Sequence, residues 1–576
     1  MKKVIIIAAI AAAGAGAYMI SQQQQPSQTT AYNVLNYVPA DTPLFTGQLE
    51  PFPIKDYLTS APTIASPNQQ KMIDDLHAKN DPKIDFFANI FSDYLQGLQN
   101  PEQFIKTFGL PEKSRGYFYT LGLLPVIKIE VENPQAIWDL LDKNEKETGF
   151  MHHEGTEQSL TYRAYSLTDE SDPANLELVI AIDKGWLTIT LNSALSEPSL
   201  LSTALGLTEA KASLAASGKI DEIIKKHNFN NASVSFINHI EIIKGLTTVD
   251  GNQLARQLTK LETEFNEPIF SEIRTPECAT DFASIANNWP QTVAGYTDMT
   301  ITKEQSTLQM SAIVESKNQV ILTALQNIRG YIPNYIGNME DSILSMGVGI
   351  DAAQLTDSLT SIWQDLQTPA YTCQPLAEIQ DNIGQSGASI GMMGMGISMA
   401  NGIKGAGFAL LDYSLKQTEN MPSIDNVDAL ISVTADNPLQ ILNSIKMFMP
   451  PELQQLQLTD NGEPVSLNTL FPIPAELNID PKLAIKGNHL VIYSGEKSKA
   501  AADTLATEKP SQNGIYDLSV DFKKLFSSLS SEAFSKEMIP EELQFMTTYD
   551  TRIKASFDIT AEGLVFGSYV NTKPSK

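Results

Sequence analysis

The chain has 576 residues, which is too long for one hydrophobic core, so we expect at least two domains. Its formal net charge is −27, from 40 basic and 67 acidic residues, and this much negative charge repels phosphate backbones. Nucleic acid is therefore excluded as an expected partner, while a hydrophobic content of 42% is that of an ordinary globular protein.

The beginning of the chain predicts export. Two lysines precede an apolar run at residues 4–20, and Ala15-Gly16-Ala17 resembles a signal-peptidase site. We expect residues 1–20 to be either a cleaved signal peptide or an uncleaved signal anchor, because the run has about the minimum length of a transmembrane helix. Residues 21–36 are mostly polar and rich in Gln, as in a tether. The body would be periplasmic, and residues 4–20 would anchor it to the inner membrane if they are not removed.

An amphipathic helix is predicted near the start of the body. Apolar residues recur at helical spacing and line one face. They are Ile84, Phe87, Phe91, Tyr94 and Leu98. We expect this stripe to pack on a sheet; the alternatives are a groove for a partner or contact with a membrane surface.

Segments of the second half of the chain resemble segments of the first half in the same order. Each pair has a similar pattern of apolar strand residues, turns and helix starts. The pairs are 126–141 with 430–445, 181–189 with 484–492, 232–239 with 514–521, and 299–304 with 557–562. Residues 252–289 have no counterpart and contain leucines at helical spacing, which predicts an inserted helix.

This order predicts an internal duplication. We expect an α+β fold with two duplicated lobes, at residues 37–317 and 318–576. Each lobe would be an antiparallel curved sheet covered by helices. A cleft between the lobes would be the expected place for a ligand.

The chain has two cysteines, Cys278 and Cys373. Export places them in an oxidising compartment, so we predict a disulfide bond that ties the lobes together. The alternative is a pair of buried free thiols.

No catalytic, cofactor-binding or metal-binding residue is predicted. His152-His153-Glu154 is the one cluster of histidines, and adjacent residues of a strand face opposite ways, so we expect an exposed loop. The sequence contains no HExxH, CxxC, nucleophile elbow or phosphate-binding loop. Two carboxylates distant in sequence would leave no such pattern, so a hydrolase is not excluded.

A segment rich in Gly and Met, residues 384–407, supports three interpretations. Its methionines are Met392, Met393, Met395 and Met399. Small residues recur four apart, at Gly394, Ser398, Gly402 and Ala406, which favours close packing of the backbone. The methionines are also suited to contact with a lipid or another apolar ligand, or to copper(I). So many glycines argue against a stable free-standing helix.

Two short segments resemble a known family. Val38-Pro-Ala-Asp-Thr42 looks like the opening of exported bacterial proteins of the DUF3352 type, and residues 114–125 look like a segment of uncharacterised envelope proteins of Gram-negative bacteria. The resemblance implies an envelope location and no catalytic residue.

Together these features predict a non-enzymatic protein of the cell envelope. Its periplasmic body would bind an apolar ligand, such as a lipid, or another envelope protein, and an uncleaved N-terminal segment would add contact with the membrane. The alternatives are a hydrolase of cell-wall or lipid substrates, with a carboxylate or serine site that the sequence does not reveal, and a pure scaffold.

Overall fold

The computed structural model describes residues 34–61, 67–169, 172, 174–385, 387–397, 400–417, 422–469, 479–527 and 549–574. The predicted signal segment, and the tether up to residue 33, lie outside this part of the chain. The chain divides into two compact units. Unit 1 extends to Glu315 and includes Thr372–Pro375, whereas unit 2 comprises Ser316–Tyr371 and the chain from Leu376 onward. Both units combine helices with antiparallel strands, which confirms the predicted α+β class.

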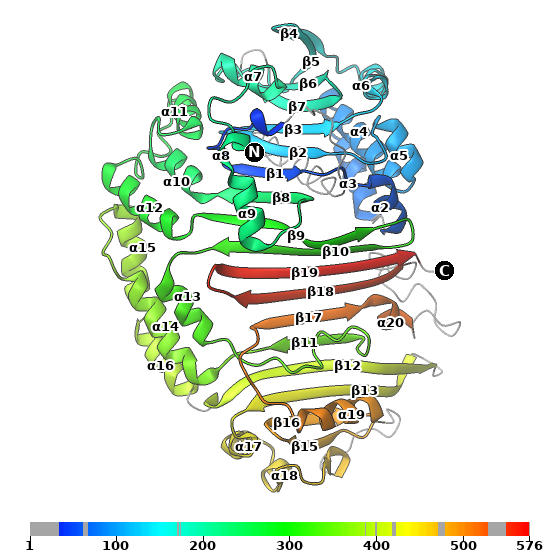
Figure 1. The fold of residues 1–576 in the computed structure, drawn as a ribbon, viewed down its shortest axis with the longest axis vertical. Helices are drawn as coiled ribbons and strands as arrows, with labels where there is room; N and C mark the ends of the chain where they lie inside the picture. Colours follow the sequence, from blue (N-terminus) through cyan, green and yellow to red (C-terminus); the bar gives the residue numbers. More distant parts are fainter. Residues whose placement is uncertain are drawn as a thin grey trace. The chain divides into compact units, whose positions relative to one another are not determined.

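The strands of unit 1 form an antiparallel sheet (Figure 1). Their order across the sheet is β4-β5-β6-β7-β3-β2-β1-β8-β9-β10. They are β1 (Leu44–Gln48), β2 (Gly116–Leu121), β3 (Leu124–Glu130), β4 (His153–Glu157), β5 (Leu160–Ser166), β6 (Glu177–Asp183), β7 (Trp186–Asn192), β8 (Ser233–Asn238), β9 (Gln291–Ile301) and β10 (Ser306–Glu315). Gly185 has a φ of +80° and forms the predicted turn between β6 and β7.

Unit 1 has helices between its strands. They are α2 (Ile54–Ser60), α3 (Pro67–His77), α4 (Pro82–Leu98), α5 (Pro101–Thr107), α6 (Pro134–Thr148), α7 (Pro198–Leu205), α8 (Leu214–Ser217), α9 (Lys219–His227), α10 (His239–Thr247), α11 (Gln253–Phe265) and α12 (Pro276–Asn288). Four of them, α2, α4, α5 and α6, contribute to the main core of the unit. Phe86 of α4 and Phe104 of α5 pack with Ile180 of β6, so these helices cover one face of the sheet. Helices α11 and α12 confirm that residues 252–289 are helical, as their leucine spacing predicts.

The predicted stripe on α4 is only partly correct. Tyr94 and Leu98 pack against the core as expected, but Phe86 and Ile90 accompany them. Phe87 is 37% exposed, and Ile84 and Phe91 are half-buried. Because apolar residues occupy more than one side of this helix, periodicity predicted the helix but not which side faces the sheet.

Unit 2 has its own antiparallel sheet, in the order β14-β15-β16-β13-β12-β11-β17-β18-β19 (Figure 1). Its strands are β11 (Leu344–Val348), β12 (Ile403–Gln417), β13 (Pro422–Ala435), β14 (Val465–Ser466), β15 (Lys482–Lys486), β16 (His489–Ser494), β17 (Tyr516–Asp521), β18 (Tyr549–Ile559) and β19 (Gly563–Pro574). Its helices are α13 (Gln319–Asn327), α14 (Ala352–Leu366), α15 (Gln374–Gly384, beginning in the 372–375 segment), α16 (Gly387–Ile397), α17 (Pro438–Ile445), α18 (Pro451–Gln454), α19 (Glu496–Leu505) and α20 (Phe522–Ser527).

The two strand orders correspond. In unit 1 the run β6-β7-β3-β2-β1-β8-β9-β10 has the same connectivity as β15-β16-β13-β12-β11-β17-β18-β19 in unit 2. The four pairs of similar segments fall on equivalent strands: β3 with β13, β6–β7 with β15–β16, β8 with β17, and β9–β10 with β18–β19.

The Asn-Pro motif begins a helix in both units. Pro134 and Pro438 occupy the first turn of α6 and α17, where a missing N–H costs nothing. Asn437 also accepts a hydrogen bond from the Gln440 amide at 3.0 Å and so caps α17. The motif therefore ends a strand and starts a helix in each unit.

Candidate functional site

The predicted disulfide joins Cys278, at the start of α12, to Cys373. It attaches the short 372–375 segment, whose chain continues on both sides into unit 2. The same segment is held by Asp281, which accepts hydrogen bonds from the Thr372 amide at 2.7 Å and the Cys373 amide at 2.8 Å. These hydrogen bonds lower the pKa of the Asp281 carboxyl. The free-thiol alternative does not hold, and the bond is a structural element of the chain.

The Met-rich segment forms a packed helix, α16, rather than an irregular loop. A Cβ on Gly394 would lie 3.2 Å from Thr356 of α14, and one on Gly387 would lie 2.8 Å from the ring of Trp363. The glycines therefore let α16 approach α14 closely, as the structural interpretation expects. The helix ends at Ile397, so the predicted four-residue series does not continue as a helix.

Of the four methionines in this segment, the structure describes the side chain of one. Met392 is 62% exposed on α16. The side chains of Met393 and Met395, and the whole of Met399, lie outside the described part of the chain. A lone exposed Met does not make a ligand or copper site, so this segment does not define the candidate site.

Each histidine of the pair 152–153 has a glutamate partner in the structure. His153 and Glu154 are exposed, as expected, but they belong to β4 rather than to a loop, and His152 before the strand is half-buried. The two rings do face different partners, as strand alternation predicts: His152 Nδ1 lies 2.7 Å from Glu145 and His153 Nε2 lies 3.1 Å from Glu177. In the described ranges, no group of His, Cys, Asp and Glu is arranged to hold a metal ion.

A second buried network was not predicted from the sequence. Glu315, at the end of β10, lies 2.7 Å from His227 Nε2 and 2.8 Å from Lys226 Nζ, and it accepts from Gln291 at 3.2 Å. Burial opposes the charge of Glu315, but these hydrogen bonds outweigh it and lower its pKa to about 2. His227 and Glu315 have side chains only 4% and 5% exposed. We interpret this network as a structural ion pair that fastens α9 to the sheet.

One face of the unit 2 sheet stands out as the candidate site. On five adjacent strands, every second residue points to this face, and cross-strand pairing aligns the residues into three rungs. From β12 to β19 the rungs are Ala406-Val348-Tyr516-Phe557-Phe566, Phe408-Met346-Leu518-Ala555-Ser568 and Leu410-Leu344-Val520-Ile553-Val570. We call these fifteen residues the apolar face. It contains no charged side chain.

The apolar face is not covered by the described parts of the chain. None of its residues is fully buried, and Met346 and Phe566 are 43% and 47% exposed. Ile431 of β13, which pairs with Phe408 at the edge of the face, is 46% exposed. A buried sheet normally presents its apolar side to the core, so this exposure needs an explanation.

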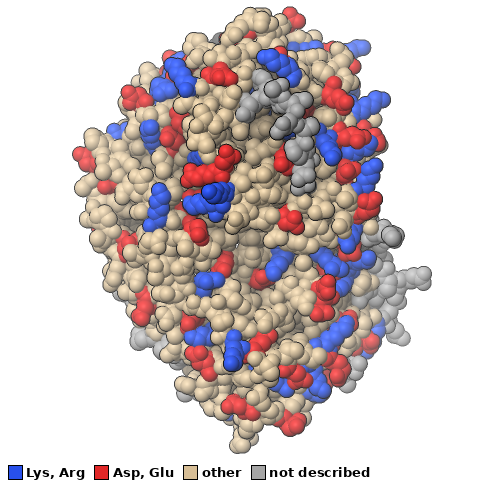
Figure 2. All heavy atoms as spheres, in the orientation of Figure 1, with Lys and Arg blue, Asp and Glu red and all other residues tan. Residues whose placement is uncertain are grey.

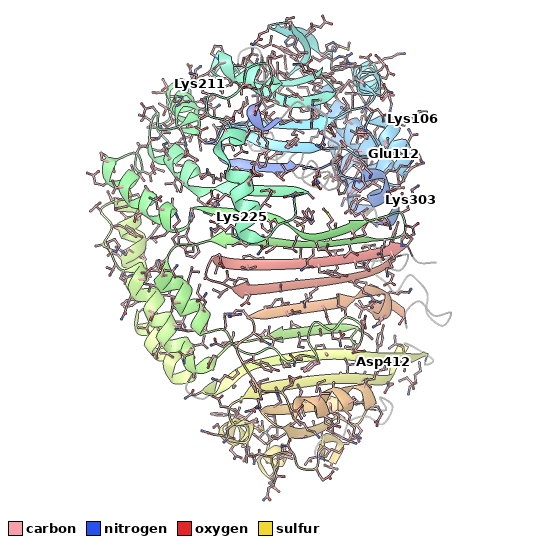
Figure 3. All side chains as sticks on the ribbon, in the orientation of Figure 1. Lys106, Glu112, Lys211, Lys225, Lys303 and Asp412 are labelled. Carbon is pink, nitrogen blue, oxygen red and sulfur yellow. A yellow bond between two sulfur atoms is a disulfide. The ribbon has the colours of Figure 1, made fainter. Side chains whose placement is uncertain are left out.

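The opposite face of the same strands carries the charged residues. Asp521 of β17 is 2% exposed and pairs with Arg552 of β18 at 3.2 Å. Asp517 and Lys554, also on β17 and β18, pair at 3.0 Å. On β12, charge appears beyond Leu410 at Asp412, which Lys497 of α19 holds at 2.6 Å (Figure 3). In the described part of unit 2, the charged side chains of β17 and β18 therefore lie on one face of the strands and the apolar face lies on the other.

The equivalent face of unit 1 is covered at β3 but not at β8, where Ile237 is 41% exposed. Ile127 of β3 holds the position that Ile431 holds on β13, yet it is only 9% exposed. In unit 1 the connection from β1 to β2 supplies α2, α4 and α5 to the core on this side. In unit 2 the connection from β11 to β12 forms α14 and α16, which pack on each other, and α14 also packs on α13. Within the described residues, α14 contacts β12, α13 contacts β18, and α20 contacts β17 and β18, so helices cover these strands in part.

Charge on the molecular surface is mixed. Acidic and basic side chains alternate over the face drawn in Figure 2, without a large basic region. Within the described ranges, no helix has the length and apolar character needed to cross a bilayer. Comparison of the chain with protein-family models, curated proteins and solved structures gave no match. The function must therefore be argued from the site itself, and the resemblance to the DUF3352 type stays a prediction.

Proposed function

We propose that this protein is a non-enzymatic binding protein of the cell envelope, and that it holds the acyl chain of a lipid on the apolar face of unit 2. One observation carries the proposal: fifteen neighbouring sheet positions contain no charge, and none of them is buried. Contiguous apolar surface of this kind is costly in water and commonly marks a binding site.

The size of the face favours a lipid chain over a protein. Strands lie about 4.8 Å apart and residues on one face repeat about every 6.7 Å, so fifteen positions cover roughly 500 Å². A stable protein interface needs about 800 Å² on each partner and a rim of polar contacts. The five strands span about 20 Å, which exceeds the ~15 Å depth of one leaflet of bilayer hydrocarbon. A single extended acyl chain therefore fits on the face and covers part of it.

The expected affinity follows from the hydrophobic effect. Burying a methylene contributes about 0.8 kcal/mol, and a chain lying on a sheet buries about half of its surface. A chain of roughly 16 carbons would gain about 6 kcal/mol, which corresponds to a dissociation constant in the tens of micromolar. Such a ligand binds reversibly, as a carrier requires.

The periplasmic location belongs to the same proposal. The disulfide between Cys278 and Cys373 supports an oxidising compartment. The predicted export segment at residues 1–20 supports passage through the inner membrane and, if uncleaved, contact with it.

We further propose that the two units arose by duplication of one α+β lobe. The shared strand order and the four similar segment pairs on equivalent strands support this origin. The open face would then be an acquired difference: one copy retains covering helices and the other leaves its sheet free for a ligand.

The test uses the full chain and the neutral apolar probe N-phenyl-1-naphthylamine, displaced by monopalmitoylglycerol. We expect probe fluorescence to rise on binding and to fall on displacement. Met346→Lys puts a charge at the centre of the face, at a site exposed enough to tolerate it, and should weaken binding at least tenfold.

The matched control is Ile269→Lys, the same type of change at a residue of unit 1 that is 68% exposed. It should bind like the parent chain. Native mass spectrometry of the chain purified from cells supplies a second readout, in which an added mass of lipid size supports the proposal. If Met346→Lys and Ile269→Lys bind the probe equally well, or if the added mass is that of a protein, the occupant of the apolar face is not an acyl chain.

A further inference from the structure

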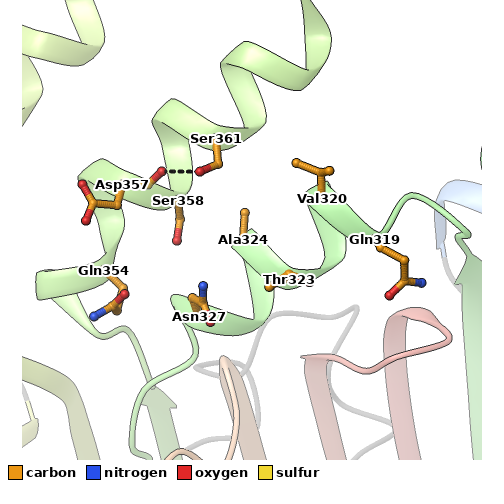
Figure 4. Close-up of a pocket in the computed structure, with 9 residues that line it drawn as sticks. All are labelled: Gln319, Val320, Thr323, Ala324, Asn327, Gln354, Asp357, Ser358 and Ser361. Atoms are coloured by element: carbon orange, nitrogen blue, oxygen red, sulfur yellow. Dashed lines mark hydrogen bonds between the residues drawn. The ribbon is translucent and has the colours of Figure 1, made fainter. Parts of the chain in front are cut away.

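A second feature of unit 2 is independent of the apolar face. A groove of about 370 Å³ runs between α13 and α14 (Figure 4). It is lined from α13 by Gln319, Val320, Thr323, Ala324 and Asn327, and from α14 by Gln354, Asp357, Ser358 and Ser361. The volume lies within the range of small-molecule sites, about 300–1,000 Å³.

The floor of the groove holds a hydroxyl without a partner. Ser358 is only 3% exposed, faces the groove, and forms no hydrogen bond with the described residues. Two neighbouring hydroxyls on the same helix behave differently: Thr360 donates to the Thr356 carbonyl at 2.7 Å and Ser361 to the Asp357 carbonyl at 2.9 Å. The hydroxyl oxygen of Ser358 is itself reachable from the groove, because it is not one of the described side-chain atoms that are fully buried without a partner. Ser358 is therefore placed to bond a molecule in the groove.

The walls have the chemistry of a site for hydroxyl groups. Gln319, Asn327 and Gln354 each present an amide that both donates and accepts hydrogen bonds. Their side chains have no hydrogen-bond partner among the described residues. Val320, which is 50% exposed, and Ala324 add a small apolar surface for C–H groups. The lining carries one charge, the carboxylate of Asp357, and no cation, which disfavours an anionic ligand.

We propose that this groove binds a small, uncharged, hydroxyl-rich molecule, such as a mono- or disaccharide unit of a glycan. Sugar hydroxyls donate and accept at once and so match the amide and hydroxyl lining. The Ser358 hydroxyl would form the buried hydrogen bond that fixes the ligand in the groove.

The test is a titration of the full chain with cellobiose and chitobiose, followed by saturation-transfer NMR, with inorganic phosphate and spermidine as charged probes. We expect one or both disaccharides to bind at millimolar concentration, and neither charged probe to compete. Ser358→Ala should lower the affinity about tenfold, because one buried hydrogen bond is lost.

Two further variants make the test specific. Ser361→Ala is the matched control on the same helix, and it should leave binding unchanged because its hydroxyl already donates to the backbone. Thr323→Trp, at an exposed position of the groove, should block binding by bulk while leaving the fold intact. The proposal is overturned if neither disaccharide binds, if phosphate or spermidine binds instead, or if Ser358→Ala and Thr323→Trp both bind like the parent. Met346→Lys should not affect disaccharide binding. The acyl-chain proposal and the disaccharide proposal can therefore fail independently of each other.

Discussion

Lys128 is an unusual residue because its cation is placed inside unit 1. The side chain lies on β3, is 1% exposed, and donates one hydrogen bond to the Thr188 hydroxyl at 2.8 Å. Burial lowers the pKa of its ammonium group from 10.5 to about 7. The unfolded chain therefore binds more protons than the native chain between pH 7 and 10.5, and stability should rise with pH across this window.

Lys128→Met should stabilise the protein near pH 7. The change removes the cost of burying the ammonium, which is on the order of a few kcal/mol, and loses the bond to Thr188, worth about 1 kcal/mol. The gain should disappear near pH 10.5, where the unfolded lysine also loses its charge. Thermal unfolding at several pH values measures this difference. Lys106→Met, at an exposed position (Figure 3), is the control and should show no such pH dependence. A variant less stable than the parent at pH 7 contradicts the argument.

For Glu315 we expect a loss of stability at acidic pH. Its pKa is lowered from 4.5 to about 2, so its contribution to stability is complete above pH 4.5 and is lost as the pH falls towards 2. Glu315→Gln leaves His227 and Lys226 without a carboxylate and should destabilise the protein at pH 7 by about 1–3 kcal/mol. Urea unfolding from pH 7 to pH 2 should show a steeper acid loss in the parent than in the variant. Glu304→Gln, at an exposed position, should follow the parent; identical acid profiles for parent and Glu315→Gln would contradict the role of this network.

These two residues show what local sequence patterns cannot reveal. Glu315 meets its partner His227 across 88 residues of chain, and Lys128 meets Thr188 across 60. No spacing rule connects such distances. The disulfide was predictable because the chain offers one possible pair of cysteines, and the predicted export segment implied an oxidising compartment.

At the scale of elements, sequence patterns predicted whether a segment is a helix or a strand better than they predicted what packs against it. The Gly-rich α16 forms a helix because α14 packs against its glycines, although intrinsic propensity disfavours it. On β17 and β18 the alternation of apolar and polar residues correctly indicates strands. That alternation says which residues share a face, but not whether another element covers the face. The candidate site could therefore not be predicted from the sequence, because its exposure depends on where the connection between β11 and β12 packs.

At the scale of the whole molecule, the two units use their connections differently. After β1, unit 1 places α2, α4 and α5 in the core against its sheet, whereas after β11 unit 2 packs α16 on α14, which contacts β12. The similar segments follow one order along the sequence in both units, but neither sheet follows that order, because β7 pairs with β3 and β16 pairs with β13. The correspondence of elements was therefore predictable, and the strand order was not. The difference in coverage was not predictable either, because helices α4 and α14 both have an amphipathic pattern.

The disulfide acts at this scale, because Cys278 and Cys373 close a loop of 95 residues. In the chain-entropy model, closing such a loop disfavours the unfolded chain by roughly 4–5 kcal/mol. Changing both cysteines to serine should therefore lower the unfolding midpoint in guanidinium chloride by a comparable free energy. Dithiothreitol should lower the midpoint of the parent and leave that of the double variant unchanged.

Asp281 should still hold the backbone of Thr372 and residue 373 after the sulfur bond is gone, so the segment should keep its place in the folded double variant. Adding Asp281→Ala to the double variant should release the segment and bring a further loss. Thiol titration of the denatured, unreduced parent gives the direct check on the bond, since two reactive thiols there would mean that it does not form. If the bond is present but its removal costs nothing, the 372–375 segment is held by its hydrogen bonds alone.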